Sequence, residues 1–410
     1  MFRSKLTWLF SIASFILFSG FMFPAWAKSE EKMECYIEGM LCIPVTPKRT
    51  DYNKNELLLL LQKDVSESFY KSLLLKYGLD ELSETSLDSL GLDLKIANTK
   101  GQDPLELSKK INRIYEELEA ATNNIYKLES NTSLLKEDLL DENGYPKSLT
   151  GAHKALQYSK GAGVLIGMID GPIDTRHSSL RGRVEQVGLV DMSQRSVAGL
   201  LHGTAVAGVM ISSHAQIGIA PEARLFSVAA FKQNSKTSFS SSSALVAQAI
   251  DYAIKKKVDV LNLSFSGGHD PLVERMIKKA ISAGIIVVAS CGNDASDKPR
   301  YPAAISGVLA VTAVDHLKRP YLKANKGKYI DVAAPGVGVL TTGPGERYRL
   351  SSGTSIAAAN VSGSLALLLA KSRKLDRDVL SFTATDLGEP GRDTSFGDGL
   401  INILSALKSL

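Results

Sequence analysis

From residue 151 to residue 410, short apolar runs alternate with longer segments whose apolar residues recur at helical spacing. The apolar runs predict strands at residues 164–169, 225–230, 258–263, 285–289 and 308–314, and the periodic segments predict helices at 202–211, 243–256, 272–283 and 355–369. Strands that are apolar throughout and separated by helices are typical of a parallel sheet covered on both faces. The sequence therefore predicts an α/β domain over residues 151–410, with any site at the carboxyl ends of the strands.

Residues 55–128 carry a different and more compact pattern. It predicts a strand at 57–61, a helix at 66–77, extended segments at 79–82 and 90–97, a helix from 104 to about 119, and a strand at 124–128. Asp103 is placed to cap the second helix, and Pro104 to occupy its first turn. This βαββαβ order indicates a small α+β domain of ferredoxin-like topology, although a generic α+β adaptor would show the same pattern. Residues 129–150 are polar, contain glycine and proline, and are expected to form an exposed linker.

The N-terminus is typical of a secretory signal peptide. Arg3 and Lys5 precede an apolar run at residues 6–23, and Ala25-Trp26-Ala27 then supplies a small-x-small cleavage pattern. We therefore assign residues 1–27 to a signal peptide and expect an exported protein, periplasmic or extracellular, with no second membrane segment. An uncleaved anchor helix is the alternative, because the run approaches the roughly 20 apolar residues that span a bilayer. Residues 28–54 show no periodicity and are expected to be an extended lead-in.

Composition argues against several classes of function. A formal charge of +5 over 410 residues, with no basic stripe, does not indicate nucleic-acid binding, and the lysines at 255–257 are interpreted as the solvated end of a helix. The six histidines show no metal-ligand spacing, so neither a metal-dependent hydrolase nor another cofactor is predicted. Cys35 and Cys42 are placed for a local disulfide, and Cys291 is interpreted as a small buried apolar residue.

Four short segments carry the residue types that serine acyl transfer requires. Asp170 ends the run Ile166-Gly-Met-Ile-Asp170, and His202 stands in Leu201-His-Gly-Thr-Ala-Val-Ala-Gly208. Asn293 closes Ala289-Ser-Cys-Gly-Asn293, and Ser355 opens a long apolar helix. A serine hydroxyl needs a base, a histidine can be that base, an aspartate can orient the histidine, and an amide can donate to an oxyanion. Each of these residues alone is common at the end of a strand or the start of a helix. The order of the four residues along one α/β pattern, however, favours a peptidase site.

The chain from about residue 149 to its end resembles the subtilisin-like serine proteases, in which the order is also Asp, His, Ser. Further segments in matching order are Gly218-Ile-Ala-Pro221, Val260-Leu-Asn-Leu-Ser264, Asp331-Val-Ala-Ala-Pro-Gly336 and Gly397-Asp-Gly-Leu-Ile-Asn402. The resemblance implies hydrolysis of polypeptide substrates through Asp170, His202 and Ser355, with Asn293 at the oxyanion. It also implies that residues 55–128 are a propeptide, an intramolecular chaperone and inhibitor, and that the linker at 129–150 is cut autocatalytically. A catalytically silent, peptide-binding scaffold is the alternative.

The resemblance further implies where substrate binds. An extended peptide is expected to pair with the strand edge formed by Leu263, Ser264, Phe265, Ser266 and Gly267. The opposite wall of the pocket before the scissile bond is expected to comprise Ser290, Cys291 and Gly292. Arg300 is expected either at the base of this pocket, where it would favour Glu or Asp, or in solvent. Ser179 stands where the family commonly has a calcium-binding aspartate, and the loop at 212–217 is short, so calcium dependence is expected to be weak.

Overall fold

The computed structural model describes residues 33–36, 41–44, 51–128, 131–133, 144–192, 196–235 and 238–410. The chain forms two compact units, Met1–Thr50 and Asp51–Leu410. In the first unit, β1 (Met33–Tyr36) pairs antiparallel with β2 (Leu41–Pro44), and the register places Cys35 opposite Cys42. The segment expected to be an extended lead-in thus contains a hairpin. The disulfide stays a prediction, and the signal peptide at residues 1–27 lies outside the described residues.

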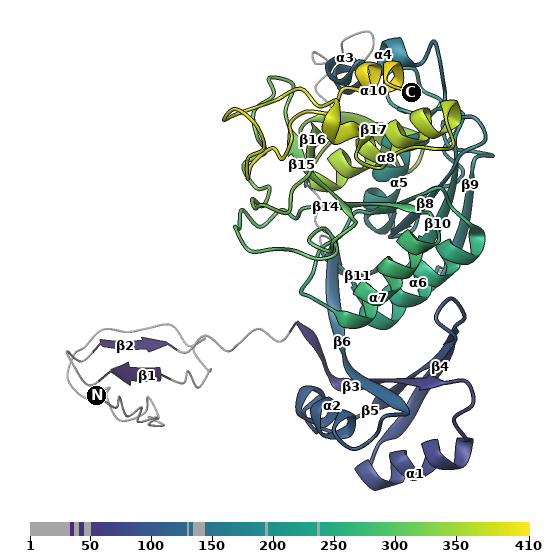
Figure 1. Ribbon diagram of the computed structural model, residues 1–410, viewed down its shortest axis with the longest axis vertical. Coiled ribbons are helices and arrows are strands. Elements are labelled where there is room, and N and C mark those ends of the chain that lie inside the picture. Colours follow the sequence, from purple (N-terminus) through teal and green to yellow (C-terminus); the bar gives the residue numbers. More distant parts are fainter. Residues whose placement is uncertain are drawn as a thin grey trace. The chain divides into compact units, whose positions relative to one another are not determined.

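The N-terminal module, residues 51–128, has the βαββαβ order that the sequence predicts (Figure 1). Its elements are β3 (Tyr52–Gln62), α1 (Glu67–Tyr77), β4 (Asp80–Leu87), β5 (Leu92–Asn98), α2 (Pro104–Asn112) and β6 (Leu118–Leu128). Ser66 caps α1 by accepting from the backbone N–H of Phe69, and Asp103 caps α2 by accepting from that of Leu105. The strands pair antiparallel in the order β6-β3-β5-β4.

The second helix of the module is shorter than predicted, and the last strand is longer. The helix expected to reach about residue 119 ends at Asn112, and the strand expected from residue 124 begins at Leu118. The Asn112 side chain donates to the Ala120 carbonyl at 2.8 Å and accepts from the Ala120 N–H at 2.7 Å. Residues 118–122 pair with β3. Tertiary pairing therefore overrides the helix propensity of this Glu- and Ala-rich segment.

The rest of the chain is built on the predicted parallel sheet. Its strands are β8 (Leu165–Asp170), β9 (Val184–Gly188), β10 (Arg224–Ala229), β13 (Val260–Leu263), β14 (Ile286–Ser290), β15 (Leu309–Val314) and β16 (Val332–Pro335). They lie in the order β16-β15-β14-β13-β8-β10-β9, and every neighbouring pair is parallel. The α/β prediction is confirmed, and β8 occupies a central position between β13 and β10.

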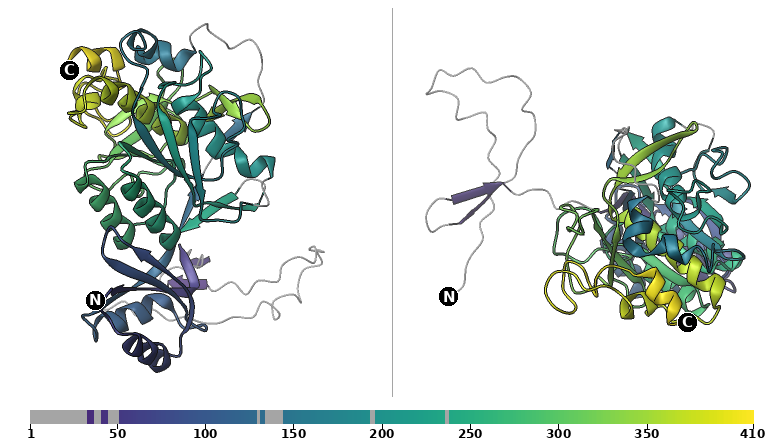
Figure 2. Two further views of the ribbon diagram at one scale, coloured as in Figure 1. Left: turned by 90° about the vertical axis from the view of Figure 1, so that its right-hand side faces the viewer. Right: turned by 90° about the horizontal axis from the view of Figure 1, so that it is seen from above.

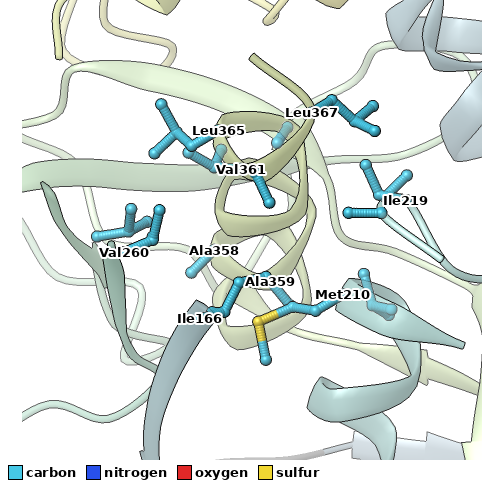
Figure 3. Close-up of a cluster of buried hydrophobic side chains, with 14 of the residues drawn as sticks. Ile166, Met210, Ile219, Val260, Ala358, Ala359, Val361, Leu365 and Leu367 are labelled. Carbon is cyan, nitrogen blue, oxygen red and sulfur yellow. The ribbon is translucent and has the colours of Figure 1, made fainter. Parts of the chain in front are cut away.

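Helices cover both faces of this sheet (Figures 1 and 2). On one face α5 (Val197–Ile211) and α8 (Thr354–Lys371) share a hydrophobic core with β8, and on the other α6 (Ser243–Lys256) and α7 (Pro271–Ser282) share a second core. Side chains of α8 meet those of β8, β13 and α5 around Ile166, Val260 and Met210 (Figure 3). α8 is long and apolar enough to cross a membrane, contrary to the expectation of no second such stretch, but 89% of it is buried inside the protein. It is a core helix.

Two hairpins and several short helices complete the described chain. The hairpin strands are β11 (Lys232–Ser235), β12 (Ser238–Ser242), β17 (Val339–Gly343) and β18 (Arg347–Ser352), and a short strand β7 (Asn131–Ser133) pairs with β18. The short helices are α3 (Tyr145–Thr150), α4 (Ala152–Ala155), α9 (Val379–Phe382) and α10 (Ile403–Lys408). The segment expected as an exposed linker thus holds β7 and α3, with its residues 129–130 and 134–143 outside the described range.

The N-terminal module and the α/β region share a sheet. β12 pairs antiparallel with the end of β6, so the module's four strands continue into the β11–β12 hairpin. Residues 51–410 accordingly form one compact unit, whereas the sequence predicted two domains joined by a linker. β6 is therefore the element that joins the module to the α/β region.

Candidate active site

A hydrogen bond joins the ends of two elements at the centre of the parallel sheet. Asp170 is the last residue of β8, and His202 lies in the second turn of α5, which begins at Val197 and not at residue 202 as predicted. Nδ1 of His202 lies 2.7 Å from Oδ1 of Asp170, and both side chains are buried. The Nε2 atom of His202 has no hydrogen-bond partner among the described residues. The carboxylate thus fixes the imidazole and leaves Nε2 available to another group.

The close approach of α5 to the end of β8 explains the glycine after His202. A Cβ atom at Gly203 would lie 2.6 Å from the carbonyl oxygen of Gly171 and 2.8 Å from that of Pro172. Gly171 in turn donates its backbone N–H to Oδ1 of Asp170 at 2.6 Å. The His-Gly pair therefore places the imidazole against the carboxylate in a way that a larger residue at 203 would block.

Ser355 lies at the N-terminal end of α8 and contacts the segment that follows β13. Its hydroxyl donates to the Ser264 carbonyl at 3.1 Å, and the Ser264 hydroxyl donates to the Ser355 carbonyl at 3.1 Å. Because β13 is the sheet neighbour of β8, Asp170, His202 and Ser355 all lie around the carboxyl ends of two adjacent strands. The Ser355 hydroxyl must leave the Ser264 carbonyl, by rotation about its Cα–Cβ bond, before it can bond to His202.

Asn293 follows β14 and is oriented by the residue before Ser355. Its Oδ1 atom accepts from the backbone N–H and from the hydroxyl of Thr354, each at 3.0 Å. Because two donors occupy the oxygen, the amide nitrogen is the end left to donate. It lies near the first turn of α8, whose unpaired N–H groups and dipole also favour negative charge. The sequence did not single out Thr354, and its only signal was its place next to Ser355.

The predicted substrate edge, Leu263 to Gly267, already binds a strand of the same chain. Lys127 of β6 donates its N–H to Ser266 at 3.1 Å and accepts from the Ser266 N–H at 3.2 Å. On its other side, β6 pairs with β12 through Lys127 opposite Ser240. The end of β6 is therefore the middle strand of three, in the position that an extended peptide would take.

Two side chains of β6 are buried in the groove, the space between β12 and residues 263–267 that the end of β6 occupies. Tyr126 stacks edge to face on Phe265, with ring centroids 5.4 Å apart, and Phe265 also contacts Phe231 at 5.0 Å. Leu128 is 4% exposed, with its Cδ1 atom 3.8 Å from where a Cβ of Gly171 would lie. The groove thus has an aromatic pocket beside Phe265 and a smaller apolar pocket beside the end of β8.

Ser290 to Gly292, the second predicted wall of the pocket before the scissile bond, lies at the end of β14. Cys291 is fully buried, and burial raises the pKa of its thiol to about 12, in agreement with its interpretation as an inert apolar residue. The Cys291 carbonyl accepts from the Tyr329 hydroxyl at 3.0 Å. Gly292 has a φ of +100°, and a Cβ there would lie 2.5 Å from the Asn325 amide. The wall therefore has no side chain beside Asn293, and a larger residue at position 292 would clash with Asn325.

Arg300 lies against this wall. Its Cγ atom would be 3.3 Å from a Cβ at Gly292, and its Nε atom donates to Oδ2 of Asp294 at 2.6 Å. The arginine side chain is 32% exposed. The backbone of the next residue, Tyr301, pairs with Gly267 and so ties this wall to the substrate edge. The sequence placed Arg300 either at the base of the pocket or in solvent, and its position is intermediate. The side chain lies beside the pocket wall and is paired with Asp294. No sequence pattern singled out Asp294, although it directly follows Asn293.

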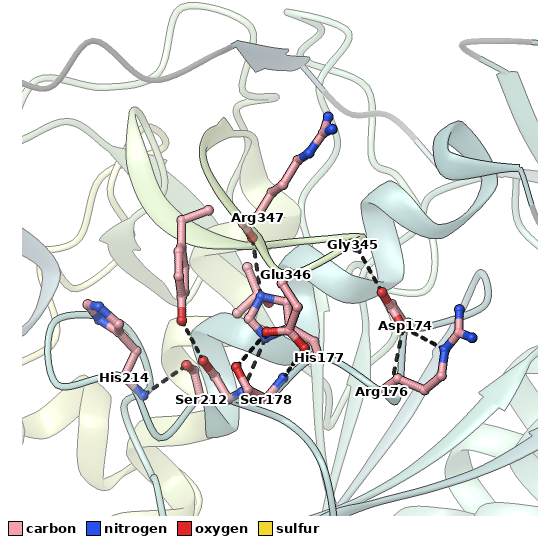
Figure 4. A network of polar contacts seen from close by, with 12 residues as sticks. Asp174, Arg176, His177, Ser178, Ser212, His214, Gly345, Glu346 and Arg347 are labelled. Carbon is pink, nitrogen blue, oxygen red and sulfur yellow. Dashed lines mark hydrogen bonds and ion pairs between the residues drawn. The ribbon is translucent and has the colours of Figure 1, made fainter.

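The segment around Ser179, where the family commonly has a calcium ligand, holds a network of polar contacts (Figure 4). The Ser179 hydroxyl shares a hydrogen bond of 2.8 Å with the Tyr348 hydroxyl, and Ser178 donates to Glu346 through its N–H at 2.8 Å and its hydroxyl at 2.6 Å. Buried His177 lies 3.2 Å through Nε2 from the Arg347 carbonyl oxygen. Among the residues that the structure describes, no group of three or more His, Cys, Asp or Glu could hold a metal ion. These contacts join the β17–β18 hairpin to the segment after β8.

Residues 161–399 match the model of the subtilase family, peptidase S8. The chain belongs to the subtilase family. It is 33% identical to subtilisin DY from Bacillus licheniformis over 259 residues, which are 60% of this chain and 92% of that protein. It is 34% identical over 209 residues to the minor extracellular protease Epr of Bacillus subtilis, covering 49% of this chain and 32% of Epr. Family and relatives assign the chain to the serine endopeptidases.

The fold also matches a solved structure over most of the chain. Fervidolysin from Fervidobacterium pennivorans, a keratinolytic enzyme related to subtilisin, superimposes with a TM-score of 0.73 and 21% sequence identity. The match covers 88% of this chain and 62% of fervidolysin. Because the identity is low, the comparison establishes the shared fold.

Proposed function

We propose that this subtilase is an exported endopeptidase, made as a precursor, in which Ser355 is the nucleophile, His202 the general base and Asp170 the group that orients His202. The observation that carries the proposal is the 2.7 Å bond between His202 and Asp170, which leaves Nε2 of His202 without a partner among the described residues. A serine hydroxyl needs such a base, because it is a weak nucleophile at neutral pH.

The proposed reaction is acyl transfer in two steps. Oγ of Ser355 attacks the substrate carbonyl carbon as Nε2 of His202 takes its proton, and the carbonyl oxygen becomes an oxyanion beside the Asn293 amide. The C–N bond then breaks, and the amine leaves with the proton from His202. Water, deprotonated by His202, attacks the acyl-enzyme and releases the new carboxylate and free Ser355. Asp170 stabilises the imidazolium and does not take the proton.

The N-terminal module is the proposed propeptide and inhibitor. Its β6 strand occupies the groove, and Leu58, Leu60, Leu87 and Leu94 of its sheet share one hydrophobic core with α6 and α7. Lys255 lies at the exposed end of α6, as predicted, and also pairs with Asp88 of the module, and the Ser89 N–H donates to Asp251 at 2.8 Å. A face this extensively packed supports a role in the folding of the α/β region as well as in its inhibition.

Export rests on the N-terminal sequence and on the extracellular relative. The Arg3 and Lys5 charges, the apolar run and the Ala25-Trp26-Ala27 ending favour cleavage after residue 27 and delivery to the periplasm or the medium. The similarity to an extracellular protease supports the same destination.

The proposed function is tested by purifying the wild type beside Ser355→Ala from a protease-deficient host. We expect a fluorophosphonate probe to label the wild type at Ser355, and mass spectrometry to show a processed wild-type chain and an unprocessed variant. Absence of labelling would favour the peptide-binding scaffold. Normal processing of Ser355→Ala would show that another protease cuts the chain.

A further inference from the structure

A buried asparagine holds the turn that contains Asn293. Asn325 lies in the loop after β15, and its side-chain oxygen accepts from the backbone N–H of Asp294 at 2.9 Å and from that of Ser296 at 3.1 Å. Its own backbone N–H donates to the Gly292 carbonyl at 3.0 Å. The residue is fully buried. Asn325 therefore contacts the backbone on both sides of the proposed oxyanion donor.

Backbone hydrogen bonds join the same two segments on either side of Asn325. The Ala295 N–H donates to the Lys323 carbonyl at 2.8 Å, and the Lys326 N–H donates to the Ser296 carbonyl at 3.0 Å. These bonds fix the backbone of Asn325 against the turn and direct its side chain toward it. The loop after β15 and the turn after β14 are thus joined through backbone bonds and through the Asn325 side chain.

The turn needs this support because its backbone is strained at Ala295, which has a φ of +51°. A residue with a Cβ atom is disfavoured in this left-handed region and stays there only where its surroundings hold it. The N–H groups before and after Ala295, those of Asp294 and Ser296, are the two that Asn325 binds. Without Asn325, we expect Ala295 to relax toward an ordinary φ, which would shift the backbone at Asn293.

The amide nitrogen of Asn325 shows that the side chain is oriented by its oxygen alone. Nδ2 of Asn325 has no hydrogen-bond partner among the described residues, although it is buried. It faces the α-carbon of Gly292, where a Cβ atom would lie 2.5 Å away. A buried amine group without a partner lowers stability. The feature that Asn325 contributes is therefore the acceptor oxygen that binds the turn.

We propose that Asn325 is a positioning residue for the oxyanion site. Asn325 fixes the backbone around Asn293, and Thr354 fixes the Asn293 side chain by donating to its Oδ1 atom. The proposal rests on the proposed function, in which the Asn293 amide donates to the oxyanion. A donor of this kind acts only where negative charge develops in the transition state. Loss of Asn325 should therefore lower kcat and leave KM nearly unchanged.

The role is tested by a double-mutant cycle between Asn325 and Asn293, with one peptide substrate and the mature enzyme. We expect Asn325→Ala to lower kcat about 10- to 100-fold and to change KM less than about threefold, because a displacement of about 1 Å is enough to weaken catalysis. In the Asn293→Ala background the same substitution should lower kcat less than about threefold, because the donor that it positions is already absent. For variants that mature too slowly, the rate constant of precursor processing supplies the same comparison.

Active-site titration separates this role from a general loss of structure. Each kcat is referred to the number of sites that the fluorophosphonate probe labels at Ser355, so unfolded protein does not count. An equal loss of kcat from Asn325→Ala in both backgrounds would overturn the proposal, because damage to the fold does not depend on the Asn293 amide. Labelling of Ser355 in the wild type would still leave the proposed function standing in that case.

Asp393 offers a matched control in another turn. Its Oδ1 atom accepts from the backbone N–H groups of Ser395 and Phe396 at 2.7 Å each, so Asp393→Ala also removes one oxygen that binds two N–H groups. We expect Asp393→Ala to keep kcat within about twofold of the wild type, because that turn carries no proposed site residue. A fall in kcat as large as that of Asn325→Ala would overturn the proposal.

The strain at Ala295 provides a rescue experiment. Glycine adopts a positive φ without steric strain, so Ala295→Gly should let the turn keep its shape when Asn325 is absent. We expect Ala295→Gly to raise the kcat of Asn325→Ala by about threefold or more, and to change the wild-type kcat by less than about twofold. No recovery would overturn the role that the proposal gives to the strained turn.

Discussion

Tyr126 of the N-terminal module and Phe265 of the substrate edge meet edge to face, with ring centroids 5.4 Å apart and an interplanar angle of 77°. Tyr126 is fully buried, and a Cβ at Gly267 would lie 2.6 Å from its ring. The phenol hydroxyl has no hydrogen-bond partner among the described residues. The module thus binds the α/β region through a ring that fills a closely fitting pocket and leaves one polar atom unpaired.

Truncation of Tyr126 should loosen the module far more than removal of its hydroxyl. In a Ser355→Ala background, we expect Tyr126→Ala to lower the free energy of urea unfolding by about 3 kcal/mol, because it leaves a cavity beside Phe265. Tyr126→Phe should change it by less than about 1 kcal/mol, because the lost hydroxyl is unpaired. A loss in Tyr126→Phe as large as that in Tyr126→Ala would mean that the hydroxyl has a partner in solution.

Asn293 and Thr354 should affect turnover to different degrees. Asn293→Ala removes a proposed oxyanion donor, and we expect kcat to fall about 100- to 1000-fold, the range known for loss of such a donor in subtilisin. Thr354→Val keeps the backbone N–H bond to Asn293 and loses the hydroxyl bond, so we expect a fall of about tenfold. Steady-state kinetics with one peptide substrate give both values. A loss in Asn293→Ala as complete as that in Ser355→Ala would instead indicate a structural role.

Stability should rise with pH because of Lys147 of α3. The side chain is 2% exposed, its amine donates to the Ala215 carbonyl at 2.6 Å, and burial lowers its pKa from 10.5 to about 8. Between these two values the unfolded chain binds more protons than the folded chain, so the free energy of unfolding increases with pH over this window.

The Lys147 contribution is measured by urea unfolding of the Ser355→Ala protein at pH 7.5 and pH 10. We expect the unfolding free energy to gain roughly 2.5 kcal/mol from this residue as the pH rises. Lys147→Met should be more stable at pH 7.5 and should lack that gain, because its side chain carries no charge to bury. Parallel pH profiles for the two proteins would show that Lys147 titrates normally in the folded state.

Chelation should have little effect on stability. Ser179 has a hydroxyl where a calcium ligand would need a carboxylate, and that hydroxyl is bonded to Tyr348. We expect EDTA to lower the thermal midpoint of the Ser355→Ala protein by less than about 10 °C, compared with the same protein in millimolar calcium. A larger fall would reveal a strong cation site elsewhere in the chain.

The sequence by itself predicted five strands of the central sheet and the helices that cover it, but not the edge strands β9 and β16, and it proposed four candidate site residues. Apolar runs such as that ending at Asp170 are strands whichever neighbours they later acquire, because burial on both faces requires them to be apolar throughout. Ser355 could likewise be assigned to a helix start from the long apolar segment that follows it. These two assignments depend on residues close together in the chain, and the structure confirms the strand that ends at Asp170 and the helix that begins beside Ser355.

Only the tertiary structure decided what depends on residues far apart. Helix propensity continues past Asn112, and pairing of residue 118 onward with β3 is what ends the helix. The pairings of Lys127 with Ser266 and of Asn131 with Ser352 join segments that no local pattern connects. The ion pair between Lys255 and Asp88 depends in the same way on two segments that are far apart in the sequence. Strand register and ion pairs depend on which distant residues come into contact. A hydrophobic pattern in the sequence indicates which residues are buried, but not which residues they contact.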